Sequence, residues 1–234
     1  MRKTLAALTG TALTAAVGAG MLLAPPPPGA TSHGLRSSAA SSCAVDGIDT
    51  GGDEALSSWK EPQSKSCTVK VKTIDGVQYT LPDPVCTPGA VNPTVKIDVL
   101  KNAAFRTGPC VRDKATSPTS KNKTYDWYDV PQPQGNTGQN QVCEKDHLVS
   151  LELGGADTLD NIWPECGPDE ATLNERYFKQ KDLVENYLAA KVRSGDIALD
   201  DAQRGIATDW TQYIAPAKTW YDGGGAVRND DNGG

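Results

Sequence analysis

The sequence predicts an α+β fold with a small β-rich N-terminal part and two C-terminal helices, stapled by disulfides. Three observations support this prediction: a two-residue turn signal lies between alternating segments near residue 75, apolar residues recur at helical spacing after residue 168, and six cysteines are spread along the chain. The length of 234 residues suits one domain of ordinary size plus a leader.

The start of the chain has the layout of a secretory signal peptide. Arg2 and Lys3 form a positive start, and residues 5–23 form an uncharged run of small and aliphatic residues. This run of nineteen residues is just long enough to span a bilayer as an anchor. Its Ala, Gly and Thr content and the four prolines after it instead favour export and cleavage between 24 and 40. We expect a signal peptide over 1–30, a flexible linker over 31–42, and a secreted, extracellular protein without stable membrane association.

The cysteines that follow the leader are even in number, which favours three disulfides in an oxidising compartment. A structural metal site would need short paired spacings such as C-x-x-C, which the sequence lacks. Successive cysteines lie 24, 19, 24, 33 and 23 residues apart, which suits sequential pairs that close similar loops. About fifteen connectivities are open to six cysteines. We predict the sequential set Cys43–Cys67, Cys86–Cys110 and Cys143–Cys166.

The charge balance is acidic. Removal of residues 1–40 would take away three basic residues and no acidic one, which changes the formal net charge from −6 to −9. A generic polyanion binder shows a basic surplus, so the composition argues against one and leaves only a local basic patch open.

Residues 43–85 are expected to be rich in β-structure. The segments CTVKVKTI and VQYTLP flank Asp75-Gly76, a pair typical of tight hairpin turns. Residues 95–105 predict a short helix that ends at the segment 106–109, which holds Gly and Pro. In the polar stretch 111–142, basic residues are either a solvated face or contacts to phosphate.

The C-terminal third predicts two amphipathic helices. Pro168, followed by two acidic residues, is typical of a first helical turn. One face then stays apolar until Gly195 ends the helix, and a second apolar face runs over 199–214. The Gly-rich residues 222–234 are expected to be disordered, which leaves 43–221 as a single folded domain.

The segment CEKDHLVSLELGGADTLDNIWPEC, residues 143–166, carries the strongest signal for chemistry. His147 is the only histidine outside the expected leader and linker, and it directly follows Asp146. The alternation in EKDHLVSLEL predicts a strand or strand-like loop, Gly154-Gly155 a sharp turn, and the residues after Asn161 a second short strand. With the helix expected to follow, the order is strand, loop, strand, helix.

The pattern DH-x6-GG-x5-N in this segment resembles the HNH (ββα-metal) endonuclease family. The flanking residues LELGG and NIWPE are similar to those of secreted bacterial HNH-like proteins. The resemblance covers about residues 143–185. It implies a nuclease that acts on nucleic acid, DNA above all, with a divalent cation: Mg²⁺, or else Mn²⁺ or Ca²⁺. The chain departs from the family in two ways, because no CxxC pair flanks the motif and no histidine follows His147.

The resemblance implies a role for each polar residue of the motif. His147 would be the general base that takes a proton from water, and Asn161 would orient its imidazole. Asp146 would be a metal ligand, with Glu170 or Asn174 as the last ligand and Glu165 in reserve. The predicted Cys143–Cys166 disulfide, which brackets the motif, would take the place of the structural zinc site that CxxC pairs form in many members of the family. Phosphate contacts are expected at four cationic residues: Arg112, Lys114, Arg176 and Lys181.

Three functions remain open on the sequence alone. A secreted nuclease accounts for the motif, the helix after it and export. A non-catalytic secreted binding module on the same scaffold would fit the acidic charge and the missing third ligand. A glycan hydrolase with paired carboxylates has only the abundance of acidic residues in its favour.

Overall fold

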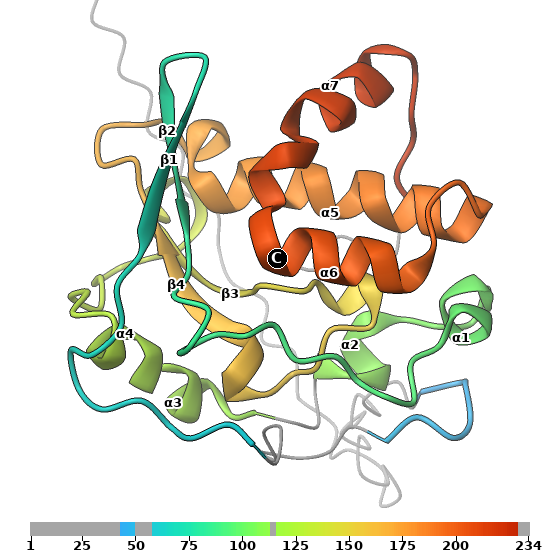
Figure 1. The fold of residues 1–234 in the computed structure, drawn as a ribbon, viewed down its shortest axis with the longest axis horizontal. Coiled ribbons are helices and arrows are strands. Elements are labelled where there is room, and N and C mark those ends of the chain that lie inside the picture. Colours follow the sequence, from blue (N-terminus) through green and yellow to red (C-terminus); the bar gives the residue numbers. More distant parts are fainter. Residues whose placement is uncertain (1–42, 50–57, 113–115, 229–234) are drawn as a thin grey trace, which may run out of the picture. The chain divides into compact units, whose positions relative to one another are not determined.

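The computed structural model describes residues 43–49, 58–112 and 116–228. These residues form a mixed α/β structure with two small antiparallel sheets and several helices (Figure 1). The expected signal peptide and linker, as well as Lys114, lie outside the described residues. In the described part of the chain, no helix is long and apolar enough to cross a membrane.

The first sheet is a hairpin of β1 (Lys70–Ile74) and β2 (Val77–Leu81). Its turn consists of Asp75 and Gly76, whose φ angles of 51° and 83° lie in the left-handed region that tight hairpin turns require. The hairpin predicted at this turn is confirmed.

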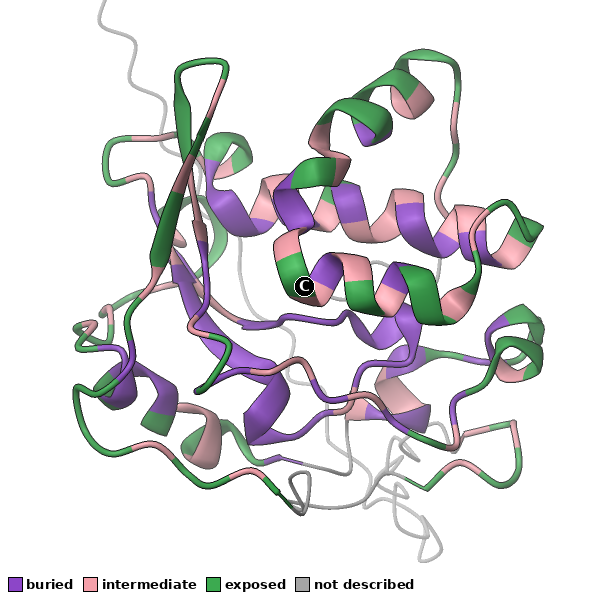
Figure 2. Ribbon diagram, in the orientation of Figure 1, coloured by how far each residue is buried: buried purple, intermediate pink, exposed green. Residues whose placement is uncertain are grey.

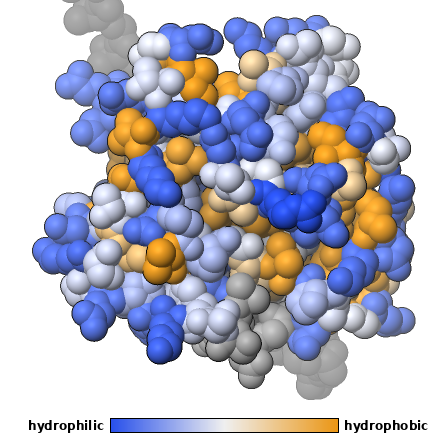
Figure 3. All heavy atoms as spheres, in the orientation of Figure 1, coloured by the Kyte–Doolittle hydropathy of each residue, from blue (hydrophilic) through white to orange (hydrophobic). Residues whose placement is uncertain are grey.

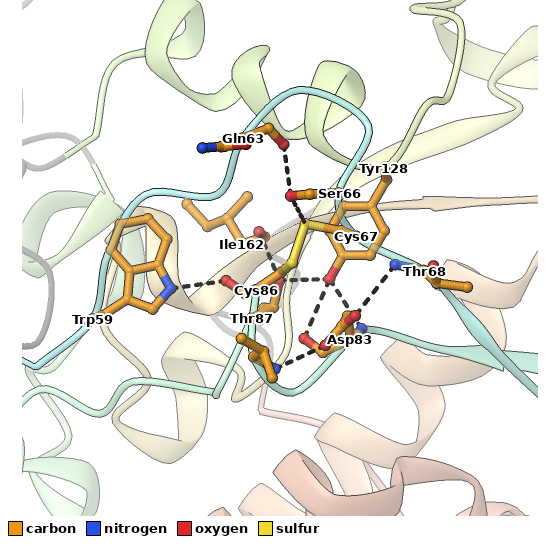
Figure 4. Close-up of a disulfide and its surroundings, with 11 residues drawn as sticks. Trp59, Gln63, Ser66, Cys67, Thr68, Asp83, Cys86, Thr87, Tyr128 and Ile162 are labelled. Carbon is orange, nitrogen blue, oxygen red and sulfur yellow. Dashed lines mark hydrogen bonds between the residues drawn. A yellow bond between two sulfur atoms is a disulfide. The ribbon is translucent and has the colours of Figure 1, made fainter.

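A disulfide between Cys67 and Cys86 joins the two ends of the hairpin (Figure 4). The carboxylate of Asp83 accepts hydrogen bonds from two backbone amides of this region, at 3.3 and 2.9 Å. The hydroxyl of Tyr128 accepts from the amide of Asp83 at 3.0 Å, and the indole of Trp59 donates to the carbonyl of Cys86 at 3.0 Å. These bonds connect the end of the hairpin to Trp59, which precedes the hairpin, and to Tyr128, which precedes the second sheet.

The second sheet pairs β3 (Cys143–His147) with β4 (Ile162–Cys166). The loop between them contains two 3₁₀ turns, η3 (Leu151–Leu153) and η4 (Leu159–Asn161). Gly155 is needed in this loop, because a Cβ there would lie 1.8 Å from the carbonyl oxygen of Val149. The predicted order of strand, loop and strand is confirmed.

Short helices precede β3: α1 (Ile97–Lys101), α2 (Thr107–Cys110), α3 (Pro118–Lys121), α4 (Lys123–Trp127) and the 3₁₀ turn η2 (Gly138–Asn140). The helix predicted over 95–105 is confirmed in its central part. The segment that was expected to end it forms α2 instead, since Pro109 lies in a first turn, where its missing N–H leaves no bond unmade. Ser117 caps α3 by accepting from the amide of Ser120 at 3.1 Å, a signal not recognised in the polar stretch.

The C-terminal third forms α5 (Tyr177–Ser194), α6 (Leu199–Asp209), the 3₁₀ turn η6 (Trp210–Tyr213) and α7 (Ile214–Asp222). The prediction that α5 starts at Pro168 is wrong. Residues 167–176 form a loop with the turn η5 (Leu173–Glu175), because the guanidinium of Arg176 donates to the carbonyls of Pro168 and Asp169. The predicted end at Gly195 is confirmed, with a φ of 87°.

The expectation of two C-terminal helices is also incomplete, because α7 begins where the second helix was expected to end. Beyond α7, in the segment expected to be disordered, the guanidinium of Arg228 donates to the carbonyl of Phe105 at 2.6 Å. Residues 229–234 lie outside the described residues.

The core gathers around α5 and the second sheet (Figure 2). Phe178 and Leu188 of α5 are completely buried, as are Trp163 of β4 and Trp210 of η6. On the face seen in Figure 3, hydrophobic residues lie as separate patches among hydrophilic ones. The fold thus holds α5 against β3 and β4 and fixes the residues that face one another there.

The described cysteines form three disulfides, of which one was predicted correctly. Cys143–Cys166 is confirmed and closes the β3–β4 pair. The predicted pairs Cys43–Cys67 and Cys86–Cys110 are wrong, because Cys67 bonds to Cys86 across the hairpin and Cys43 bonds to Cys110 of α2. Spacing along the chain does not reveal which loops a hairpin brings together. Three disulfides are typical of extracellular proteins.

Candidate active site

Strand β3 directs its side chains alternately to two sides. Lys145 and His147 share one side, and Glu144 and Asp146 share the other. The register places Glu165 opposite Glu144 on β4. The neighbours Asp146 and His147 therefore have different partners.

His147 is held by Asp157, a residue of the loop between the strands. Its Nε2 lies 2.8 Å from Oδ1 of Asp157, and His147 is 8% exposed. Because a carboxylate only accepts, the neutral imidazole carries its proton on Nε2 and has a lone pair on Nδ1. Nδ1 has no hydrogen-bond partner among the described residues. The ring is thus fixed in one tautomer with a basic nitrogen available.

Asp157 also forms an ion pair with a lysine side chain. The ammonium of Lys121 bonds to the same Oδ1, and Oδ2 accepts from the backbone amide of Thr116 at 3.3 Å. Burial alone would raise the pKa of Asp157, but the bond from His147 and the charge of Lys121 hold that pKa below its ordinary value. Asp157 therefore stays ionised next to the imidazole.

Burial lowers the pKa of His147 below its ordinary value of 6.5. The bond to Asp157 opposes this effect, while the charges of Lys121 and Arg112 add to it. The imidazole is consequently neutral near pH 7, which is the state that a general base requires.

His147 lines an open groove of about 420 Å³. Three cationic side chains, Arg112, Lys121 and Lys145, line the same groove, together with one acidic side chain, Glu144. The ammonium of Lys145 donates to Oδ1 of Asn122 at 2.9 Å, and burial lowers the pKa of Lys145. A groove of this charge attracts phosphate even on an acidic protein, because the local field decides where an anion binds.

On the other side of β3, Asp146 is paired with a lysine of α5. Lys181 is 0% exposed, and its ammonium lies 2.7 Å from Oδ2 of Asp146. The same ammonium pairs with Glu185 and donates to the carbonyl of His147 at 2.8 Å. The indole of Trp163 donates to Oδ2 of Asp146 at 3.3 Å. Asp146 is therefore fixed by groups of the chain itself.

Further carboxyl groups surround this ion pair. Burial raises the pKa of Glu144 to about 7 and the pKa of Glu185 to about 8. Burial also raises the pKa of Glu165 well above 4.5, and the charge of Asp146 adds to this effect. Neither carboxyl oxygen of Glu165 has a hydrogen-bond partner within the described chain. This side of β3 is strongly acidic and mostly buried.

The divalent cation that the motif implies would need hard oxygen ligands. Among the residues with described positions, no three His, Cys, Asp or Glu side chains form a ready-made cage. Glu144 nevertheless has a buried carboxylate oxygen without a hydrogen bond close to Asp146. A Mg²⁺ ion usually keeps several waters and needs only one or two carboxylates. The donor chemistry beside Asp146 therefore fits a hydrated hard cation.

Asn161 was expected to orient the imidazole of His147, but its side chain bonds to backbone groups instead. Its amide oxygen accepts from the backbone amide of Val149 at 2.9 Å, and its NH₂ group donates to the carbonyls of Val149 and Ala156 at 2.9 and 2.8 Å. Asn161 shapes the loop after β3, and Asp157 orients the imidazole in its place.

The remaining predicted residues are only partly brought together. Glu170 and Asn174 are exposed in the loop before α5 and do not line the cavity at Asp146, because α5 starts later than predicted. Arg176 and Lys181 are buried and bonded within the chain, which does not agree with a phosphate contact. Arg112 does line the groove.

Four residues of this site were not predicted: Glu144, Lys145, Asp157 and Glu185. Strand alternation was a usable signal for Lys145, since it places Lys145 on the side of His147. Helical spacing was a usable signal for Glu185, which lies one turn after Lys181. For Asp157 the sequence holds no such signal, because its position depends on the path of the loop.

Comparisons with known proteins leave the site to be interpreted from its own geometry. Searches of protein-family models, curated proteins and solved structures find no match to this chain. The resemblance to HNH nucleases thus depends on the motif alone.

Proposed function

We propose that this protein is a secreted, metal-dependent nuclease that hydrolyses phosphodiester bonds of nucleic acid, DNA in particular, with His147 as general base. The observation that carries the proposal is the neutral imidazole at the cationic groove, with Nε2 bonded to Asp157 and Nδ1 without a partner among the described residues. Secretion is supported by the signal-like leader and by the three disulfides.

In the proposed reaction a phosphodiester binds in the groove with a water molecule at Nδ1 of His147. The imidazole takes a proton from this water as its oxygen bonds to phosphorus and the bond from phosphorus to the leaving oxygen breaks. Asp157 stabilises the imidazolium, and the leaving oxygen takes up a proton from solvent. Arg112 and Lys145 offset the negative charge that develops on the phosphate, and Lys121, which is paired with Asp157, adds to the positive potential of the groove. A divalent cation beside Asp146 would supply further charge neutralisation.

A non-catalytic binding module remains the second candidate, and one observation favours it. The ammonium of Lys181 already neutralises Asp146, the predicted metal ligand. On that account the groove would bind phosphate groups without cleaving them.

The test is cleavage of plasmid and single-stranded DNA by the purified, disulfide-bonded protein with Mg²⁺, Mn²⁺ or Ca²⁺, with EDTA as control. We expect metal-dependent cleavage that His147→Ala abolishes while DNA binding, followed by fluorescence anisotropy, persists. Binding without cleavage by the wild-type protein would establish the binding module instead.

A further inference from the structure

The groove at His147 extends well beyond the imidazole. Cys143 at one end of β3 and His147 at the other both line it, so the groove follows the strand for about 13 Å at a rise of about 3.3 Å per residue. Its volume of about 420 Å³ lies in the range typical of sites for whole small molecules and is far larger than one phosphate group needs. The proposed reaction uses only the His147 end.

The cationic side chains gather at the His147 end of the groove. Lys121 bonds to the carboxylate of Asp157 that holds the imidazole. The charges of Lys121 and Arg112 both act to lower the pKa of His147, which places them near the ring. A phosphate group is therefore bound most favourably at this end.

The Cys143 end of the groove is lined by neutral hydrogen-bonding side chains. The amide groups of Asn136 and Gln141 donate to the carbonyl of Cys143, at 2.7 and 3.3 Å. Within the described part of the chain, Oε1 of Gln141 has no partner, and Gln132, in the same segment before β3, makes no side-chain hydrogen bond. Gln132 and Gln141 thus retain donors and acceptors for a ligand.

Tyr125 of α4 points to a ligand independently of these amides. It is 5% exposed and lines the groove, and its hydroxyl has no hydrogen-bond partner among the described residues. A buried tyrosine hydroxyl usually has a partner, which a ligand in the groove would supply. Phosphate is a poor candidate here, because the charge of Glu144, which also lines the groove, acts on Tyr125.

We propose that the Cys143 end of the groove binds one unpaired nucleobase through Tyr125, Gln132 and Gln141, while the adjoining phosphate lies at the His147 end, so that the substrate is a single-stranded nucleic acid. The edges of bases present hydrogen-bond donors and acceptors side by side, which glutamine amides match. A base enters such a site most readily where it is unpaired and unstacked. The inference rests on the proposed function, whose substrate class it narrows.

The test is the binding of three fluorescein-labelled DNA probes of equal length: a single strand, its duplex, and a single strand of abasic units. Binding is measured by fluorescence anisotropy in EDTA, so that no metal-dependent cleavage occurs. Phosphate contacts alone would favour the duplex, which has the higher charge density. We expect the opposite order, with the single strand bound at least about tenfold more tightly than either other probe.

Tyr125→Phe removes only the hydroxyl and should weaken binding of the single strand about 3–10-fold, with no change for the abasic strand. Gln132→Ala should have the same effect. The matched control is Gln134→Ala, because Gln134 is an exposed glutamine of the same segment that does not line the groove. The abasic strand separates a lost base contact from damage to the groove, since damage would weaken the binding of both strands.

Equal affinity for the single strand and the abasic strand would overturn the proposal, as would an unchanged preference for bases in both Tyr125→Phe and Gln132→Ala. Near-ultraviolet circular dichroism checks the fold, and if Tyr125→Phe does not fold, Gln132→Ala alone decides. Base-dependent binding by a protein that cleaves no DNA when a divalent cation is added would uphold the base site and overturn the nuclease. Cleavage by a protein that binds both strands equally would do the reverse.

Discussion

The two sides of β3 carry opposite chemistry although their residues alternate within the four letters EKDH. On one side, Lys145 and His147 line a groove with further cations, and burial keeps the imidazole neutral. On the other side, Glu144 and Asp146 face the carboxyl groups of α5 and the buried ammonium of Lys181. Desolvation therefore lowers the pKa of His147 on one side and raises the pKa of Glu144 and Glu185 on the other.

Under the proposed function, this difference explains how an acidic chain would present a site for a polyanion. The formal net charge is −6, but much of the acidic charge near the motif is buried on the α5 side of the sheet. The groove is lined by three cationic side chains, Arg112, Lys121 and Lys145, against one acidic side chain, Glu144. Local placement of charge, rather than its total, supports a nucleic-acid substrate.

The stability that the acidic side of β3 contributes should depend most on Lys181. We expect Lys181→Met to lower the free energy of unfolding by about 3–5 kcal/mol, because it leaves buried carboxylates without their cation. Lys179→Met is the control, since the Lys179–Asp182 pair is partly exposed and should contribute less than about 1 kcal/mol. Urea denaturation measures both, and equal losses would show that the buried cluster has no special role.

The groove side should depend on Asp157 for activity. Asp157→Asn should lower kcat on the order of 10²-fold with little change in KM, because an amide can donate to Nε2 and so shift the proton to Nδ1. The exposed Asp196→Asn is the control. A change confined to KM would assign Asp157 to substrate binding instead.

The sequence predicted the parts of the fold that depend on neighbouring residues. The Asp75-Gly76 turn, the strands on either side of Gly154-Gly155 and the end of α5 at Gly195 all follow from local backbone preferences. Contacts between distant segments decided the rest. The Arg176 bonds displaced the start of α5, and the hairpin set the partner of Cys67.

The same division holds for the candidate site. His147 and Asp146 were found from the motif, and the structure places both at one cavity. Asp157 lies ten residues after His147 along the chain and reaches its ring only through the turn of the loop. Glu185 lies one helical turn after Lys181, but its approach to Asp146 depends on the packing of α5 on β3, which neither segment shows alone.

The free energy of unfolding should also depend on pH through the carboxyl groups on the acidic side of β3. Burial raises the pKa of Glu165, so the folded state binds this proton more tightly than the unfolded state. The associated stability is present below the ordinary pKa of 4.5 and is lost as pH rises through the raised folded value. Its neighbours are Glu144 and Asp146 of β3 and Lys181 and Glu185 of α5.

In the wild type, the free energy of unfolding should fall between pH 5 and pH 9. In Glu165→Gln this fall should be smaller by about 1–3 kcal/mol. Denaturation at the two pH values measures it. Parallel stability curves for both proteins would show that Glu165 does not titrate in this range.

The smallest effect is expected from single cations of the groove. Lys145→Ala should reduce the slope of log binding constant against log salt concentration by about 0.7–0.9, one phosphate contact. Lys123→Ala, an exposed lysine paired with Glu61, should leave the slope unchanged. Identical slopes for the wild type, Lys145→Ala and Lys123→Ala would show that Lys145 makes no phosphate contact.

The central claim is that the imidazole of His147 is the base, and chemical rescue tests it most directly. The initial rate of cleavage of a single-stranded oligonucleotide is measured for wild type and His147→Ala, with and without added imidazole. The account predicts a loss of about 10²–10⁴-fold in His147→Ala that added imidazole partly restores. Cleavage by His147→Ala at the wild-type rate would contradict it.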